Sequence, residues 1–264
     1  MLMAVKNQFK ITLLSIKYAI MREMLNKTTF ITNVVFMILN NSSFLIQWIV
    51  LFSLKKSIGG YTLKQVLLLW GIAASVYGVA HFLFKKAFYL SETINNGKLD
   101  TFIVQPKNIL LSAITTDVEP SAIGDIIYGY ILLIIYGINI YNFLLFTLFS
   151  ICGGLIITSI SIILNSLSFW IQKSDIIAET GTNLMTTFST YPDGIFKGIT
   201  KILLYTIIPV GISVYIPIKV ISKFNIYLTL LVIVVTALFV LLAFKVFYAG
   251  LKKYSSSNLM VARI

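Results

Sequence analysis

Polar side chains recur at helical spacing within three apolar stretches of the 264-residue chain. Steps of three and four residues place the members of each set on one face of an α-helix. The three sets are Asn33, Asn40, Ser43 and Gln47, with Phe36 completing the spacing; Gly154, Thr158, Ser161, Asn165 and Ser168; and Asp175, Glu179, Thr182, Thr186 and Ser189. An unpaired amide or carboxylate is costly in hydrocarbon, so these faces must turn away from lipid. They either bond helices together or line a path for a substrate, and one face can do both.

Acidic residues within apolar stretches are candidates for ionisable chemistry at membrane depth. Asp125 lies one helical turn into its stretch, where it serves either as a functional acid or as a capping group near a helix start. The other two acids are Asp175 and Glu179, in a stretch whose depth the sequence leaves open. This set is too sparse for a proton relay, which weakens a gradient-driven mechanism.

Sequence motifs for catalysis are absent from the chain. It has no GxxxxGK(S/T) phosphate loop, no GxSxG nucleophile turn and no HExxH zinc motif. The only histidine, His81, has no second ligand at metal spacing, and the only cysteine, Cys152, lies inside an apolar run. We therefore expect a protein that is not an enzyme by itself, that binds no cofactor or metal, and that takes energy from a partner or a gradient.

The composition is that of an integral membrane protein. Hydrophobic residues make up 58% and charged residues 11% of the chain, with a mean hydropathy of +0.92. Soluble domains contain about 45–50% apolar and about 25% charged residues. The net charge is +12, but no basic run exceeds two residues. The excess charge therefore favours anchoring at the cytoplasmic face of a lipid bilayer over nucleic-acid binding.

The apolar runs predict an all-α membrane protein with six spans in a single domain, residues 1–264. Residues 1–27 form an amphipathic helix on the membrane surface in this prediction. Five spans are predicted near residues 28–54, 62–84, 121–140, 143–164 and 226–249. The sixth has two alternatives. Hydropathy alone selects 202–218, whereas the other version makes 168–190 a polar span and 194–221 a re-entrant segment.

The distribution of lysine and arginine predicts the orientation. In both versions, the segments on the side of the two termini carry most of the 21 basic residues. By the positive-inside rule both termini are cytoplasmic. The long polar insertion at 85–117 lies on the same side, and it mixes aromatic and aliphatic residues with charges, which suits a docking surface.

Three motifs give the sequence a family resemblance. The first is Thr93-Ile94-Asn95-Asn96-Gly97-Lys98-Leu99-Asp100 followed by Val104-Gln105-Pro106; the second is Tyr191-Pro192-Asp193-Gly194-Ile195-Phe196 with Ile208-Pro209-Val210 and Ile216-Pro217; the third is Gly250-Leu251-Lys252-Lys253-Tyr254-Ser255-Ser256. In this order and spacing they resemble the type-2 ABC exporter permeases. The likeness is strongest to a bacterial subfamily of similar length whose permease genes often occur in pairs beside an ATPase gene.

The resemblance implies partners and a mechanism. Two permease subunits would pair, as a homodimer or with a sister subunit, in a bacterial cytoplasmic membrane. Two ATPase subunits, which bind the ATP and Mg, would dock on the cytoplasmic face. The loop within 85–117 would couple them to the permease. The coupling residues would be Glu92, Asn95, Asn96, Gly97, Lys98 and Asp100.

The resemblance also favours the re-entrant version of the topology. Tyr191, Pro192, Pro209 and Pro217 would shape the turns of segment 194–221. An amphipathic drug, peptide, lipid or other small molecule would be exported along the subunit interface. The pathway residues would be Asn33, Asn40, Gln47, Thr182 and Thr186. The alternative is a gradient-driven carrier or channel, which would need intramembrane acids such as Asp125 and Glu179.

Overall fold

The computed structural model describes residues 2–171 and 174–255. Throughout these residues the regular structure is helical. The elements are α1 (Leu2–Glu23), α2 (Lys27–Leu54), α3 (Leu63–Phe84), η1 (Lys85–Tyr89), α4 (Leu90–Asn95), α5 (Asp100–Ile103), α6 (Ile109–Ile114), α7 (Ala122–Gly137), α8 (Ile140–Ser166), η2 (Leu167–Phe169), α9 (Ser174–Ser189), η3 (Asp193–Ile195), α10 (Gly198–Thr206), η4 (Gly211–Tyr215), α11 (Ile216–Ser222) and α12 (Ile226–Leu251). Ser256, the last residue of the C-terminal motif, and residues 172–173 of the predicted 168–190 span lie outside the described residues.

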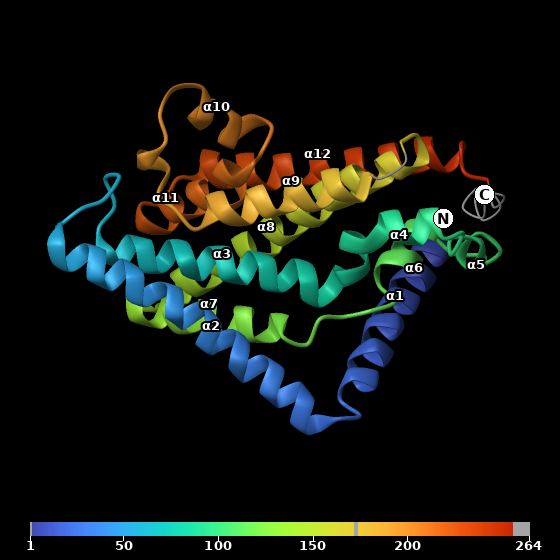
Figure 1. The fold of residues 1–264 in the computed structure, drawn as a ribbon, viewed down its shortest axis with the longest axis horizontal. Helices are drawn as coiled ribbons and strands as arrows, with labels where there is room; N and C mark the ends of the chain where they lie inside the picture. The colour runs from blue at the N-terminus through green and yellow to red at the C-terminus, as the bar shows by residue number, and fades with distance from the viewer. Residues whose placement is uncertain (1, 172–173, 256–264) are drawn as a thin grey trace.

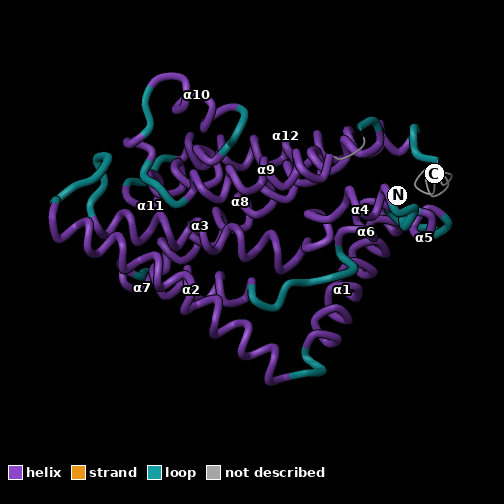
Figure 2. Tube along the Cα trace, viewed as in Figure 1, coloured by secondary structure: helices purple, strands orange, loops and turns teal. Residues whose placement is uncertain are grey.

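Apart from α1, which crosses one end steeply, the long helices run roughly along the length of the molecule, and most of the short elements gather at its two ends (Figure 1). One end carries α10 and α11, and we call it the α10 end. The other end, the loop end, carries α1, α4, α5 and α6 beside the N-terminus. Figure 2 shows the loop that leads from α6 to α7 along the outside of the bundle. The two ends thus present different kinds of surface, which the long helices connect.

Helix α3 forms the centre of the bundle. It begins at a capping box, in which Thr62 and Gln65 exchange hydrogen bonds, and most of its residues are buried. Small residues allow α7 to approach closely: a Cβ at Gly129 would overlap the Ser75 hydroxyl oxygen, and one at Gly78 would lie 2.6 Å from Ile126. This close packing fixes α7 against α3.

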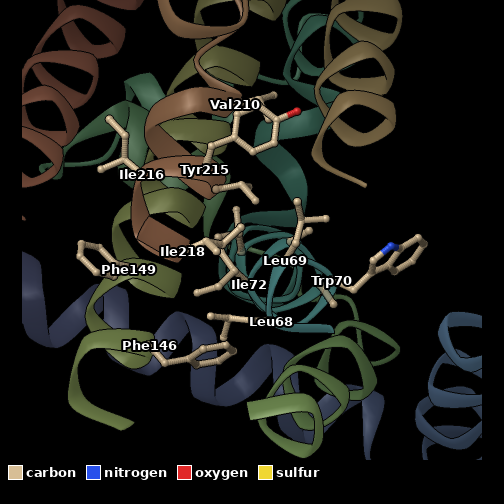
Figure 3. Packing of buried hydrophobic residues seen from close by; sticks show 14 of the residues in the cluster. Leu68, Leu69, Trp70, Ile72, Phe146, Phe149, Val210, Tyr215, Ile216 and Ile218 are labelled. Atoms are coloured by element: carbon tan, nitrogen blue, oxygen red, sulfur yellow. The ribbon is translucent and has the colours of Figure 1, made fainter. Parts of the chain in front are cut away.

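The apolar core lies where α3 meets α8 and α11. Figure 3 shows side chains of α3 facing Phe146 and Phe149 of α8, with Tyr215 and Ile218 completing the cluster, whereas Trp70 extends away from it. These side chains are nearly or fully excluded from solvent, Trp70 being the most exposed of them. Burial on this scale makes α3, α8 and α11 a rigid centre.

Helices α2 and α12 lie at the periphery. In the most apolar 18-residue window of each, only 17% of α2 and 22% of α12 is buried inside the chain. Their outward side chains are mainly apolar, including Ile31, Phe36 and Leu39 on α2 and Leu238 and Leu241 on α12. Such surfaces need lipid or a partner subunit to cover them.

The six predicted spans are not all confirmed. Among the described residues, four helices are long and apolar enough to cross a membrane: α2, α8, α12 and α3 with its continuation to Asn95. The helices Gly198–Thr206 and Gly211–Ser222 are together apolar enough for a fifth span, but they meet at a bend of 77°. They count as a fifth span only if this bent pair is taken as one broken span. Helices α7 and α9 have 16 residues each, about 24 Å, which is short of the ~30 Å hydrocarbon core.

Candidate functional site

A cavity of about 600 Å³ lies between α2, α3, the start of α7 and the end of α9. Each of these elements contributes polar side chains, and the rings come from α2, α3 and Tyr191, which follows α9. The polar lining consists of Asn40, Asn41, Gln47, His81, Glu119, Ser121, Asp125, Thr186, Thr187, Ser189 and Thr190. The volume suits a drug-sized ligand.

Asp125 is held by α2. Its Oδ1 accepts a hydrogen bond from Asn41 Nδ2 at 2.6 Å, and the Tyr128 hydroxyl donates to the Asn41 carbonyl oxygen at 3.1 Å. Helix α7 approaches α2 closely here, since a Cβ at Gly124 would lie 2.5 Å from the Val34 carbonyl oxygen. The Asn41 amide and the close helix contact therefore orient the carboxylate at the cavity wall.

Aromatic rings form much of the remaining wall. Phe44 of α2 stacks on Trp70 of α3 with centroids 5.7 Å apart, and Trp48 meets Tyr191 edge-on at 6.0 Å. Tyr77 also lines the cavity, and its ring stacks on His81. The cavity thus combines one carboxylate, several amides and hydroxyls, and an apolar aromatic surface.

The predicted pathway residues separate into two groups. Asn40, Gln47 and Thr186 line the cavity, whereas Asn33 is exposed on α2 outside it and Thr182 does not line it. The Thr182 carbonyl oxygen instead accepts a hydrogen bond from the Tyr77 hydroxyl at 3.3 Å.

The two intramembrane acids separate in the same way, since Asp125 lines the cavity and Glu179 is exposed on α9 away from it. Tyr191, one of the predicted turn residues, lines the cavity as well.

Sequence reasoning missed the rest of the cavity wall. It did not select Asn41, Trp48, Trp70 or Tyr77, and it considered His81 as a metal ligand that lacks a second one. Apolar and aromatic residues in a membrane span have the pattern of lipid-facing or core positions. Only the position of Asn41 beside Asn40, in the polar face of α2, offered a signal.

The polar face of α8 bonds helices together. The Asn165 side-chain oxygen accepts from the Ser91 backbone N–H at 3.2 Å, and the Ser161 hydroxyl donates to the Ala87 carbonyl oxygen at 3.1 Å. A Cβ at Gly154 would lie 2.7 Å from Val79. The polar face of α8, from Gly154 to Asn165, therefore attaches the segment after α3 to this helix.

The predicted coupling residues lie on one surface at the loop end, which we call the loop surface. Glu92 and Lys98 form an ion pair of 2.7 Å, and both side chains are more than half exposed. Asn95 and Asn96 are exposed beside them, and Gly97 turns the chain with a positive φ of 67°. Asp100, which begins α5, is half-buried. The exposed apolar residues of the loop surface are Tyr89, Ile103 and Val104.

The loop surface has a rigid base. Leu90, Ile94 and Leu99 are fully buried and pack in one apolar cluster with Ile162 of α8 and Phe247 of α12. Because the cluster joins the loop to two long helices, the loop surface and these helices form one body.

Helix α1 also docks at the loop end. Its Gln8 side-chain oxygen accepts from the Asn108 backbone N–H at 2.8 Å, and Ser15 donates to the Thr115 carbonyl oxygen at 2.8 Å. Arg22 pairs with Asp117. The apolar residues Phe9 and Leu13 remain exposed on another face, as a surface-lying amphipathic helix requires.

The α10 end is built around Asp193, which sequence reasoning named only within a motif. The Tyr61 hydroxyl donates to Oδ1 at 2.8 Å and the Tyr205 hydroxyl donates to Oδ2 at 2.7 Å. Lys219 Nζ lies 3.2 Å and Lys201 Nζ 3.8 Å from Oδ2. These four partners come from the α2–α3 connection, α10 and α11, so one carboxylate ties three segments together.

The remaining predicted turn residues frame this network. Pro192 immediately precedes Asp193 and is buried. Pro209 lies at the break between α10 and the Gly211–Ser222 helix, and Pro217 lies in the first turn of α11. Proline cannot donate a backbone hydrogen bond in a helix interior, so Pro209 accounts for a break at this point.

The long apolar helices and the exposed apolar surface define a class of protein, a helical integral membrane protein. A family model described as ABC-2 family transporter protein matches residues 37–258, which is most of the chain. The chain therefore belongs to the ABC-2 family of transporter proteins, as the sequence motifs indicated. No match was found among curated proteins or among solved structures. Membrane components of this family are typically non-catalytic and generally act with ATPase subunits.

Proposed function

We propose that this chain is the permease subunit of an ATP-driven exporter, with ATP and Mg bound by separate ATPase subunits. The observation that carries the proposal is the loop surface. It presents exposed charges and apolar side chains on a base that is buried against α8 and α12. A solvated connection would have no need of that base, whereas a surface that transmits force requires it.

In the proposed mechanism, the ATPase subunits dock on the loop surface from the cytoplasm. ATP binding draws them together and displaces the loop surface, and the buried cluster carries this motion to α8 and α12. The permease then exchanges an inward-facing for an outward-facing state, a two-state equilibrium biased by nucleotide. Both termini are cytoplasmic in this arrangement, and the membrane is that of a bacterial cell.

Two permease subunits complete the proposed transporter, either two copies of this chain or this chain and a sister subunit. The exposed face of α2 is the surface that a second subunit would cover. The proposed substrate path runs beside that surface; in support, Asn40 and Gln47 on α2 and Thr186 on α9 line the cavity. The substrate in this proposal is amphipathic, because the path combines apolar rings with amides and hydroxyls.

A gradient-driven carrier or channel is the second candidate, and one observation favours it. Asp125 lies in the cavity, where a carrier would hold its coupling acid. Against it, Glu179 does not line the cavity and Glu119 is paired with Lys85 at 3.0 Å. Within the part of the chain that the structure describes, Asp125 therefore has no neighbouring unpaired acid to relay a proton.

Co-purification tests the proposal. The tagged full-length chain is extracted from native membranes in mild detergent, and the eluate is assayed for bound subunits and ATP hydrolysis. We expect an ATPase subunit in about one-to-one ratio with total permease. The double variant Glu92→Gln with Asp100→Asn should lose it, because the change removes charges from the loop surface. An exposed ion pair such as Glu92–Lys98 contributes only ~0–1 kcal/mol to stability, so the fold should survive.

The control variant carries Glu23→Gln with Asp175→Asn, the same change in charge at two acids outside the loop surface. It should retain the ATPase. An eluate without any ATPase, under conditions that preserve other complexes, would reject the proposal and favour the carrier.

A further inference from the structure

We propose that the cavity binds an amphipathic organic cation, with the positive centre at Asp125 and the apolar body against the aromatic wall. This inference names the substrate class and rests on the proposed function, since it takes the cavity as part of the transport path. Three observations support it: the charge of the cavity, the aromatic rings in its wall, and the residue spacing along α2.

The charge of the cavity is negative and uncompensated. Among the ion pairs of the described chain none involves Asp125, whose one hydrogen-bond donor is the neutral Asn41 amide. Glu119, at the edge of the cavity, is already neutralised by Lys85. No lysine or arginine of the described residues lines the cavity. A carboxylate in a low-dielectric site attracts a cation and repels an anion.

The rings supply the second argument. Five of them line the cavity, from Phe44, Trp48, Trp70, Tyr77 and Tyr191. The faces of such rings attract cations, and tryptophan does so most strongly. The same rings bury the apolar part of a ligand. A simple inorganic cation would leave this surface unused, which points to an organic one.

The spacing of residues along α2 gives the distance between the Asp125 carboxylate and the aromatic wall. Asn41, which holds Asp125, lies seven residues before Trp48 on the same helix, and Phe44 lies between them. At 1.5 Å per residue this separation is about 10 Å. A ligand that reaches both parts of the cavity therefore combines a positive charge with a flat or branched apolar body of about this length.

Tetraphenylphosphonium and tetraphenylborate are the probes for this proposal. Both carry four phenyl groups around a central atom, with opposite charges. The chain has three tryptophans, of which Trp48 and Trp70 line the cavity and Trp170 does not. In a Trp170→Phe background the tryptophan fluorescence therefore reports on the cavity. The full-length protein is purified in detergent and titrated with each probe.

We expect a saturable fluorescence change with tetraphenylphosphonium and none with tetraphenylborate. In the same background, Asp125→Asn should raise the apparent Kd for the cation at least about tenfold, because the ion pair is lost. Asp125→Glu should keep most of the affinity, and Asp175→Asn, which removes an exposed acid outside the cavity, should leave it unchanged.

Equal binding of the two probes would overturn the proposal, as would the absence of saturable binding or an unchanged Kd in Asp125→Asn. The comparison of the probes on the background protein does not depend on the folding of any Asp125 variant. The assay also needs no ATPase. If the cation fails to bind while the ATPase co-purifies, this inference is wrong and the proposed function stands. If the cation binds but no ATPase associates, the proposed function is wrong.

Discussion

Asp193 and Asp125 are both removed from most solvent, and their surroundings differ sharply. Asp193, at the α10 end, is 4% exposed and has four partners, two tyrosine hydroxyls and two lysine ammonium groups. Asp125, at the cavity wall, has one neutral donor, the Asn41 amide. The two residues have the same side chain, but only the first has its charge compensated by the chain itself.

The contrast distinguishes a structural acid from one available to a ligand. A buried charge is tolerated when paired and hydrogen-bonded, and its partners then share in the stability of the fold. At Asp193 the partners come from segments far apart in sequence, so pairing holds the α10 end together. At Asp125 the compensation is incomplete, and a bound cation would supply the remainder.

The largest effect that the contrast predicts is the loss of stability in Asp193→Asn. The amide has the shape of the carboxylate but no charge, so it weakens charge-assisted hydrogen bonds from Tyr61 and Tyr205 and leaves Lys219 without its anion. We expect a loss on the order of 3 kcal/mol, seen as a fall in the apparent melting temperature of the detergent-purified chain.

The control for this measurement is Asp175→Asn, which removes an acid exposed on α9 and should change the melting temperature little. An Asp193→Asn protein as stable as the unchanged chain would show that the four partners do not act on the carboxylate.

The contrast also marks what the sequence could predict. Apolar runs and their period located the long helices, because the requirement to satisfy backbone groups in lipid leaves a helix as the simplest solution. Polar side chains in lipid need partners as well, so the polar face of α8 is expected to bond helices together or to line a substrate path. Asn165 and Ser161 do bond to the segment after α3. The period of α2 likewise identified Asn40 and Gln47, both of which line the cavity.

The Asp193 network and the aromatic wall could not be predicted in this way. Tyr61, Asp193, Tyr205 and Lys219 are separated by up to 158 positions along the chain, so only the tertiary fold brings them together. The rings at Trp48 and Trp70 have the composition of ordinary membrane-span residues, and nothing in their spacing tells a cavity from lipid. The predicted count of six spans is not confirmed, because α7 and α9 have only 16 residues each and are short for a helix that crosses a membrane.

A second, smaller effect is the response of the α10 end to acid. Burial raises the pKa of Asp193, but hydrogen bonds from Tyr205 and Tyr61 and the charge of Lys219 outweigh it, and the pKa is lowered overall. The stabilisation is therefore complete above the ordinary pKa of an aspartate, about 4, and is lost as the pH falls through the lower pKa of the folded state. Lys201 also faces this carboxylate, with its Nζ 3.8 Å from Oδ2.

Thermal unfolding measured between about pH 3 and pH 6 tests this response. The unchanged chain should lose stability at the acid end, and Asp193→Asn should show a flatter profile because it has no carboxylate to protonate. Parallel profiles for the two proteins would assign the acid sensitivity to other groups.

The smallest effect on stability is expected for Asp125→Asn. Comparing it with Asp193→Asn shows most directly how differently the two aspartates contribute to stability. The asparagine oxygen can still accept the hydrogen bond from Asn41, while the cost of burying an uncompensated charge disappears. The apparent melting temperature should stay the same or rise, by the equivalent of about 0–1 kcal/mol. Melting of the unliganded chain beside Asp193→Asn measures the difference. A loss as large as that of Asp193→Asn would mean that Asp125 also holds the fold together, and the cavity would then have no free charge to offer a cation.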